Sequence, residues 1–534
     1  MDIEYFYLRR LALLYAVLPL AIFLVFWLRF SLSLLGVFCL IVTVFAMREG
    51  GGDSAFVSPA EMMCSGERGS GTDGDGCLHV GIHALIALAL IAILWCVLGG
   101  QGGFWYQSPD WGIRNAIFRD LITHPWPVFY NDGGAALCYY FGFWLPTAGL
   151  GRLLLLAGAP MDVVWALSNV LLLLWTASGV MLVFLLMIDV LGIREDKLVI
   201  AASLFLVFFS TPDILGLLVS GKWGDAIRAV HLEWWATGVA QVGQISSITT
   251  CLFWVFNQAV IPWICTLLFL GEKNFSRYLL IFAAAFFSGP MPGVGLAALM
   301  VAQGIGVIIP ACRADAHGPH PLRSVLSAWN GAGLLFACIA ALFFSANSAV
   351  SNTAAMQTSV QNALSYPLWF PHNKRLAVLA LAFVVIEGLL IPLLCYRDFK
   401  RVPVFWGVIT TLVLCPFIRI GGGADFCMRS SIPAVLMMCL FAFRSLWLHP
   451  FWGRGLPADV VAVALAVVLA LGAITPAFEI GRGFVACFGV LDDTLYDRYE
   501  GESLEGMDFS ALNFGFDNPG EDAFFRLVGK MPQQ

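Results

Sequence analysis

Runs of apolar residues alternate with polar connections along most of the chain. Several runs exceed about 18 residues, the length that a helix needs to cross the hydrocarbon core of a bilayer. The pattern therefore predicts an all-α membrane protein, a polytopic helical bundle with about 12–14 transmembrane segments. The apolar runs fall at about 11–29, 31–47, 80–98, 135–157, 163–191, 198–218, 248–270, 278–288, 292–311, 326–346, 376–396, 403–418, 430–447 and 458–478.

Polar stretches divide the chain into four predicted parts. They are an N-terminal transmembrane hairpin (1–47), a flexible loop rich in Gly, Ser and Asp (48–79), a polytopic membrane domain (80–480) and a small acidic tail (481–534). The membrane domain contains four long polar connections, at 99–134, 219–247, 347–375 and 419–429.

Composition excludes several classes of protein. Of the 534 residues 60% are apolar and 12% are charged, whereas a soluble domain is about a quarter charged. The net charge of -6 lies in the tail, which holds ten acidic and four basic residues, so no basic surface for nucleic acid is expected. Most of the 14 cysteines lie inside apolar runs, without a CxxC pair or a metal-ligand spacing, and they predict no disulfide framework.

Basic residues in short turns predict how the chain is oriented. Turns at 272–277 and 397–401 are basic, and Arg9 and Arg10 precede the first run, so these positions are expected in the cytoplasm. The four long connections and the tail are then extracytoplasmic, in a plasma (inner) membrane. One conflict remains, because an odd number of crossings must separate 99–134 from the basic turn at 194–197. Only two runs lie between them, so either one is re-entrant or the stretch contains a further helix.

The connection at 99–134 carries the first candidate for chemistry. Asp110 and Arg114 are i,i+4 neighbours on a predicted helix, and Ile113, Ile117 and Leu121 lie on another of its faces. This spacing predicts an amphipathic helix at the membrane surface. In one interpretation Asp110 and Arg114 are a solvated ion pair. In the other, Asp110 is a general base that accepts a proton from a hydroxyl and Arg114 orients it.

The connection at 219–247 and the run after it place polar groups beside aromatic rings. That combination suits carbohydrate, because rings cover the apolar faces of sugars while amides and carboxylates bind hydroxyl groups. An aromatic belt at the interface is the alternative for the tryptophans, and a helix–helix hydrogen bond is the alternative for the amides. The candidate substrate-binding residues are His231, Glu233, Trp234, Trp235, Asn257 and Gln258.

Five basic residues fall at helix ends that are expected on the extracytoplasmic side. Membrane proteins usually have their basic residues on the cytoplasmic side. Arginine binds phosphate through paired hydrogen bonds and lysine binds it as a point charge, so a phosphate or pyrophosphate ligand would explain them. Snorkelling to lipid head groups is the alternative. The five residues are His372, Lys374, Arg375, Arg419 and Arg429. Glu387 is an intramembrane acid and is therefore either a further functional candidate or a helix-packing residue.

Several stretches resemble a family of bacterial multi-spanning proteins. They are Asp110-Trp111, Arg114-Asn115-Ala116-Ile117, Trp126-Pro127-Val128, Tyr139-Tyr140-Phe141-Gly142, Leu145-Pro146, His231-Leu232-Glu233-Trp234-Trp235, Phe253-Trp254-Val255-Phe256-Asn257-Gln258 and Asp425-Phe426-Cys427-Met428-Arg429-Ser430. The architecture, with an acid in the first large outer loop, also resembles the GT-C integral-membrane glycosyltransferases. Asp110 is at the position of their catalytic acid. Two extra helices and a loop precede that loop here, which departs from the simplest pattern of the superfamily.

The GT-C resemblance implies a function. It implies a glycosyltransferase that moves a sugar from a polyprenyl-phosphate donor to an envelope glycan, lipid or protein acceptor, among membrane lipids. Asp110 would deprotonate the acceptor hydroxyl, and Lys374, Arg375 and Arg429 would stabilise the leaving phosphate. Nothing demands a metal, although a divalent cation is compatible with the acidic tail. The alternatives are a transporter or flippase of lipid-linked sugars and a non-catalytic assembly protein of the cell envelope.

Overall fold

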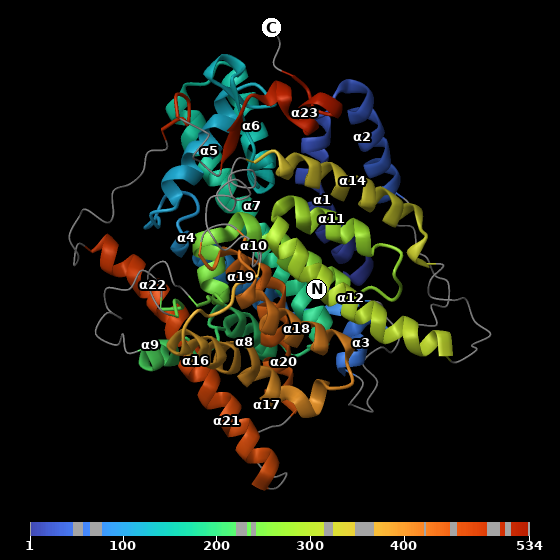
Figure 1. The fold of residues 1–534 in the computed structure, drawn as a ribbon, viewed down its shortest axis with the longest axis vertical. Helices are drawn as coiled ribbons and strands as arrows, with labels where there is room; N and C mark the ends of the chain where they lie inside the picture. Colours follow the sequence, from blue (N-terminus) through green and yellow to red (C-terminus); the bar gives the residue numbers. More distant parts are fainter. Residues whose placement is uncertain are drawn as a thin grey trace.

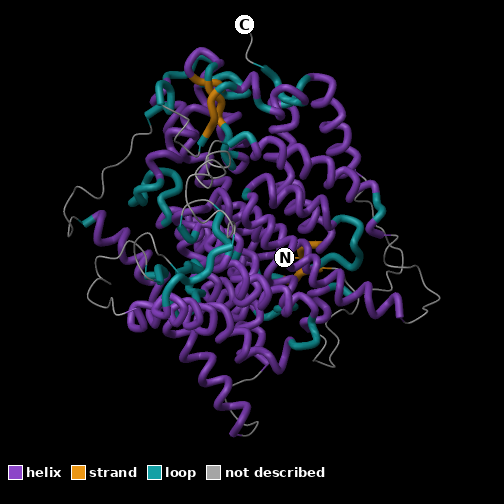
Figure 2. The backbone as a smooth tube through the Cα atoms, viewed as in Figure 1, coloured by secondary structure: helices purple, strands orange, loops and turns teal. Residues whose placement is uncertain are grey.

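Helices make up most of the computed structural model, as Figure 2 shows. The structure describes residues 2–45, 57–64, 77–220, 232–235, 242–313, 324–347, 368–420, 423–448, 456–488, 502–507 and 514–531. Within these ranges, seven helices are long and apolar enough to cross a membrane, and five shorter apolar helices accompany them. This agrees with the expected all-α, multi-pass membrane protein.

The helices follow the predicted apolar runs closely (Figure 1). In the first half of the chain they are α1 (Tyr5–Trp27), α2 (Phe30–Phe45), α3 (Pro59–Cys64), α4 (Ile82–Leu98), α5 (Trp111–Thr123), α6 (Leu145–Leu156), α7 (Met161–Leu191), α8 (Asp196–Val207), α9 (Ile214–Ser220) and α10 (Ile248–Leu270). In the second half they are α11 (Tyr278–Ser288), α12 (Pro290–Arg313), α14 (Ala328–Ser345), α16 (Lys374–Phe383), α17 (Leu390–Phe399), α18 (Pro403–Leu414), α19 (Asp425–Ser430), α20 (Ile432–Leu448), α21 (Leu456–Gly472), α22 (Ile474–Cys487) and α23 (Ala523–Leu527).

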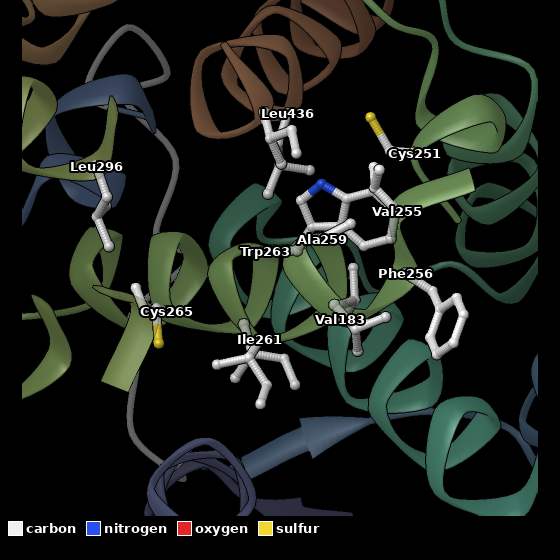
Figure 3. Packing of buried hydrophobic residues seen from close by; sticks show 14 of the residues in the cluster. Val183, Cys251, Val255, Phe256, Ala259, Ile261, Trp263, Cys265, Leu296 and Leu436 are labelled. Atoms are coloured by element: carbon white, nitrogen blue, oxygen red, sulfur yellow. The ribbon is translucent and has the colours of Figure 1, made fainter. Parts of the chain in front are cut away.

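Helix α10 is the centre of the bundle. All of its residues from Ile248 to Leu270 are buried, and it packs against α1, α7, α11 and α20. Figure 3 shows Ile261 and Trp263 of α10 among side chains from these neighbours, including Val183 and Leu436. The polar side chains of α10, among them Asn257 and Gln258, would be costly in contact with lipid, which favours a position inside the bundle.

The helices run between two ends of the bundle that hydrogen bonds identify. At one end, which we call the Arg9 end, Arg9 of α1 bonds to Asp189 of α7 at 2.9 Å and to the carbonyl of Gly271, which follows α10, at 2.8 Å. At the other, the tail end, Arg29 follows α1 and donates to the carbonyls of Phe525 and Arg526. The start of α1 and the C-terminal segment therefore lie at opposite ends.

The conflict in the number of crossings concerns the stretch that contains α6. This helix has 12 residues and spans about 18 Å, which is shorter than the ~30 Å hydrocarbon core. It packs against α5 and α7, close to α5 and α23 at the top of Figure 1. The carboxylate of Asp196, just after α7, accepts a hydrogen bond from the backbone N–H of Gly81, just before α4. Thus α4 and α7 connect the same two ends of the bundle, and the short α6 lies between them in the sequence.

The polar connections that the sequence predicts on one side do meet at the tail end. Gln101 donates to the carbonyl of Leu252 in the first turns of α10, at 3.1 Å. Arg419 donates to the carbonyl of Val242 at 2.8 Å, and the backbone N–H of Trp369 bonds to the carbonyl of Phe417. Described parts of all four connections are therefore close to the start of α10.

The first two predicted parts are joined to the bundle. Helix α1 contacts α7, α10 and α11 as well as α2, so the hairpin at 1–47 is packed within the membrane domain. The interval 48–79, expected to be flexible, contains α3 and the short strand β2 (Cys77–His79), which pairs with β1 (Asp2–Glu4). Glu61 of α3 forms an ion pair with Lys273 at 2.9 Å, which places α3 at the Arg9 end.

The C-terminal segment closes the tail end. Strand β5 (Gly515–Asp517) pairs antiparallel with β4 (Ala135–Leu137), which also pairs with β3 (Phe129–Tyr130). Helix α23 follows, and its Phe524 lies at 0% exposure against Phe23 and Phe343. The segment is bound by the loop after α5 and by the ends of α1 and α14.

Candidate functional site

The predicted Asp110–Arg114 pair is present at the start of α5. Arg114 Nη2 donates to Asp110 Oδ2 at 2.9 Å, and the side chains are 5% and 52% exposed, respectively. Trp111 anchors this turn by stacking on Phe256 of α10, with ring centroids 4.9 Å apart. Asp110 is consequently a solvent-accessible carboxylate whose partner is held inside the protein.

Helix α5 is more enclosed than the expected surface helix. Ile117 and Leu121 are fully buried, as predicted for its apolar face, but Ile113 is 39% exposed. Polar residues are buried as well, because α6 and the C-terminal segment cover the other side of the helix. The carboxylate of Asp120, at 0% exposure, is one of them.

A second arginine lies beside the tyrosines that follow β4. Arg429 of α19 bonds to Asp425 Oδ2 at 2.8 Å, and its guanidinium lies 6.0 Å from the ring centre of Tyr140. Burial raises the pKa of the neighbouring Tyr139, and the positive charges of Arg114 and Arg429 oppose that shift. Both guanidinium groups therefore act on the same phenol. We call Asp110, Arg114, Tyr139, Tyr140, Asn257, Asp425 and Arg429, together with Gln258 as the neighbour of Asn257 in α10, the tail-end cluster.

Several buried N–H groups of the cluster have no hydrogen-bond partner. They are at Nε and Nη1 of Arg114, at Nε of Arg429 and at Nε2 of Gln258, and Gln258 Oε1 is also unpaired. An unpaired buried polar group costs free energy, and such groups in a folded protein call for a ligand, water or functional explanation. Among these residues, the two arginines point most clearly to a ligand, because each has unpaired N–H groups that can bind an anion.

The two amides of α10 differ in their surroundings. Asn257 Nδ2 donates to the carbonyl of Tyr140 at 3.3 Å, and the Asn257 carbonyl accepts from Ser288 of α11. The side-chain N–H of Asn257 is thus bound to the loop after β4, the bond to α11 uses its backbone carbonyl, and its Oδ1 has no hydrogen-bond partner. Gln258 is 1% exposed, and its unpaired amide is the better candidate for contact with a ligand.

Glu233 and Trp235 belong to an internal network instead of an open sugar pocket. Glu233 accepts hydrogen bonds from the Ser246 hydroxyl at 2.6 Å and the Ser247 N–H at 2.9 Å. Trp235 Nε1 donates to Glu387 at 2.9 Å. Glu233 and Trp235 are 1% and 0% exposed, so the expected contact with carbohydrate has no geometric support.

The remaining parts of this connection are similarly occupied or not described. Trp234 Nε1 donates to Gln244 Oε1 at 2.9 Å. His231 lies outside the described residues. Burial raises the pKa of Glu233, and four hydrogen bonds to its carboxylate act in the opposite direction. Burial also raises the pKa of Asp213, and Glu387 and Glu233 raise it further.

Of the five basic candidates, only Arg429 is in the tail-end cluster. The Arg419 guanidinium stacks on Trp369 at 4.5 Å from the ring centre and donates to the Val242 carbonyl, so protein groups hold it in place. His372, Lys374 and Arg375 have exposed side chains at the start of α16. The expected group of five phosphate ligands is therefore divided among three places.

Sequence reasoning missed the tyrosines of the cluster as site residues. Tyr139 and Tyr140 follow β4, and their rings are 3.9 Å apart. The ring of Phe514, in the C-terminal segment, contacts Tyr139 at a centroid distance of 5.3 Å. Their position in a stretch of the family resemblance was the available signal, but which groups they face depends on the folding of distant segments.

In the part of the chain that the structure describes, no group of three or more His, Cys, Asp or Glu side chains is arranged to hold a metal ion. Comparisons of the chain with protein-family models, with curated proteins and with solved structures return no match. The residues of the site are therefore the basis for its proposed chemistry.

Proposed function

We propose that the protein is a membrane glycosyltransferase that takes a sugar from a polyprenyl-phosphate donor. The observation that carries the proposal is the pairing of an exposed carboxylate, Asp110, with Arg114, whose remaining N–H groups are buried and unpaired. A transferase of this kind needs a base for the acceptor and a cation for the leaving phosphate. The tail-end cluster offers both, and Arg429 supplies a second cation.

The proposed reaction proceeds by inversion at the sugar C1. An acceptor hydroxyl attacks C1 while Asp110 accepts its proton, since a carboxylate can take up a proton as the new bond forms. The new C1–O bond forms, the bond from C1 to the phosphate oxygen breaks, and polyprenyl phosphate leaves. Arg114 and Arg429 stabilise the charge on that phosphate through charge-assisted hydrogen bonds.

The arrangement of the helices supports a lipid-linked donor. The cluster lies at the ends of apolar helices, where a phosphate head group and its hydrocarbon tail would meet polar and apolar protein surfaces, respectively. A cavity of about 280 Å³ between α8, α20 and α21 is lined by Phe205, Phe208, Phe209, Leu446, Ala466, Leu469, Ala470 and Ala473. Its lining suits a hydrocarbon chain and offers no charged group for the sugar or phosphate.

We further propose that the tail end is extracytoplasmic and the Arg9 end cytoplasmic, in a bacterial plasma membrane. Arg9, Lys273 and Arg277 gather at the Arg9 end, where the positive-inside bias places basic residues. The acceptor would then be an envelope glycan, lipid or protein. In this arrangement the acidic C-terminal segment lies on the acceptor side.

The test follows release of polyprenyl phosphate by the purified full chain in lipid, with a panel of polyprenyl-phosphate monosaccharides and envelope extract as the source of acceptor. Asp110→Asn should bind donor as the wild type does and lose at least ~99% of turnover, because removal of a general base typically costs 10²–10⁴-fold. Asp162→Asn is the matched control, since Asp162 is an exposed aspartate in the first turn of α7, outside the cluster. Equal turnover by Asp110→Asn and wild type would contradict the proposal.

Transport of lipid-linked sugars is the second candidate, and one observation favours it. Glu387 is 1% exposed within the long apolar helix at 374–399, where an acid is a functional candidate. Asn330, another polar residue at depth, bonds to Leu279 N–H and the Phe275 carbonyl and is explained by structure. Flux of a lipid-linked sugar across liposomes that persists in Asp110→Asn, without release of polyprenyl phosphate, would favour transport.

A further inference from the structure

Two cysteines lie in direct contact beside the tail-end cluster. The sulfur atoms of Cys415 and Cys427 are 3.5 Å apart, and the side chains are 2% and 0% exposed. Cys415 directly follows α18, and Cys427 is in α19, two residues from Asp425 and from Arg429. Among the described residues, the sulfurs of this pair are the ones that contact each other directly.

The described residues on both sides of positions 421–422 are held by folded structure. Ile418 pairs with Leu368, Arg419 extends to the Val242 carbonyl, and Gly423 has a positive φ of 55°. The two cysteines, 12 apart in sequence, come into contact through α18 on one side and α19 on the other. The contact between the sulfurs is thus a consequence of how α18 and α19 are packed.

We infer that Cys415 and Cys427 form a disulfide bond that holds the turn between α18 and α19. A disulfide needs its sulfurs about 2.05 Å apart, so each sulfur has less than 1 Å to move if both shift. Closing this loop restricts the unfolded chain and thereby stabilises the fold. The disulfide would hold Arg429 and Asp425 relative to α18, but its formation does not depend on the proposed reaction.

Formation of the disulfide bond requires an oxidant, and a second disulfide in an oxidising compartment is the class of oxidant that we propose. One cysteine thiolate attacks the oxidant disulfide and forms a mixed disulfide, releasing one thiol. The second cysteine then attacks the bonded cysteine sulfur and releases the other thiol, so two electrons and two protons pass to the oxidant. Since both sulfurs are buried in the folded chain, this exchange takes place before α19 packs onto α18.

The burial of the pair has a consequence for its later behaviour. A reductant in solution must reach one of the two sulfurs to reverse the bond, and neither sulfur is accessible in the folded chain. The disulfide is therefore a permanent link of the mature protein. It should resist mild reductant until the chain is denatured.

The experiment measures the oxidation state of each cysteine in the full chain. Cells are quenched with a membrane-permeable maleimide, and the protein is denatured with more of the same reagent. It is then reduced and treated with a maleimide of different mass before peptide mass spectrometry. We expect Cys415 and Cys427 to carry the second label in most molecules. Cys395 and Cys439, which are equally buried, should carry the first.

Two cysteine variants test the pairing, one inside the pair and one outside it. In Cys415→Ser, Cys427 should change to the first label, while Cys439→Ser should leave labelling of the pair unchanged. First label on both Cys415 and Cys427 of the wild type would overturn the inference. Turnover is not read in this experiment, so a failure of the disulfide and a failure of the proposed function are separate results.

Discussion

At the scale of single residues, burial decides what each candidate can do. Asp110 is half exposed and close to a buried arginine, whereas Glu233 is buried and bonded to Ser246 and Ser247. Both are acids beside tryptophans in the sequence, and hydropathy does not separate them. The structure separates them because a carboxylate whose oxygens already accept hydrogen bonds from the protein has little capacity left for a substrate.

The buried Asp213 predicts how stability depends on pH. Burial raises its pKa above the ordinary ~3.9, and the nearby acids Glu387 and Glu233 raise it further. The folded chain thus keeps a proton that the unfolded chain releases, so stability is fully present below the ordinary pKa and falls as pH rises toward the folded pKa. The slope is at most ~1.4 kcal/mol per pH unit for one proton.

Asp213→Asn removes this proton and should make the slope smaller, while Glu233, whose pKa burial also raises, maintains part of it. The measurement is the thermal-unfolding midpoint in detergent from about pH 4 to about pH 7, the range above the ordinary pKa of an aspartate. Asp162→Asn, which replaces an exposed aspartate, should keep the wild-type slope. If the Asp213 variant also keeps that slope, the carboxyl does not hold a proton in the folded chain.

At the scale of elements, α5 is positioned by the C-terminal segment. Asp120 Oδ2 accepts hydrogen bonds from the Tyr130 hydroxyl at 2.9 Å and the Leu504 N–H at 3.0 Å. Nearby, Glu505 accepts from the Asn131 N–H at 2.7 Å. The helix that carries Asp110 and Arg114 is consequently bound to residues almost 400 positions later in the chain.

Asp120→Asn should loosen this connection. Both hydrogen bonds go to Oδ2. The neutral amide oxygen that replaces it accepts them more weakly than a charged carboxylate oxygen, a loss of about 1–3 kcal/mol. We expect faster hydrogen–deuterium exchange at the Leu504 N–H and along β5, by roughly 5–100-fold from that energy. Asp517→Asn, an exposed residue of β5, is the matched control. Unchanged exchange in the Asp120 variant would show that the segment is held by other contacts alone.

Hydropathy predicted most of the long helices but not which of them pack against each other. The Asp110–Arg114 contact was predictable because i,i+4 residues on a helix are neighbours whatever surrounds them. The shortness of α6 was not predictable, since the apolar run at 135–157 is long enough to cross a membrane. Arg114 and Arg429 are brought near Tyr139 by segments far apart in sequence, so no local pattern indicates that they belong to one site.

At the scale of the whole molecule, the two ends of the bundle carry different kinds of residues. Basic residues and short turns gather at the Arg9 end, and the tail-end cluster, the described parts of the polar connections and the C-terminal segment gather at the other. The central α10 connects these ends, with its apolar length in the core and its amides near the cluster. In our proposal the tail end carries the reaction and the helices hold the lipid part of the donor.

The most direct test of this account is the affinity of polyprenyl-phosphate sugar for the full chain and two arginine variants. Arg429→Lys keeps the charge but loses the planar paired donors, so we expect affinity to fall about 10-fold or more, the effect of one charge-assisted hydrogen bond. Arg419→Lys should bind donor as the wild type does, because Trp369 and the Val242 carbonyl already hold that guanidinium. Wild-type affinity in Arg429→Lys together with a loss in Arg419→Lys would contradict the account and place the phosphate outside the tail-end cluster.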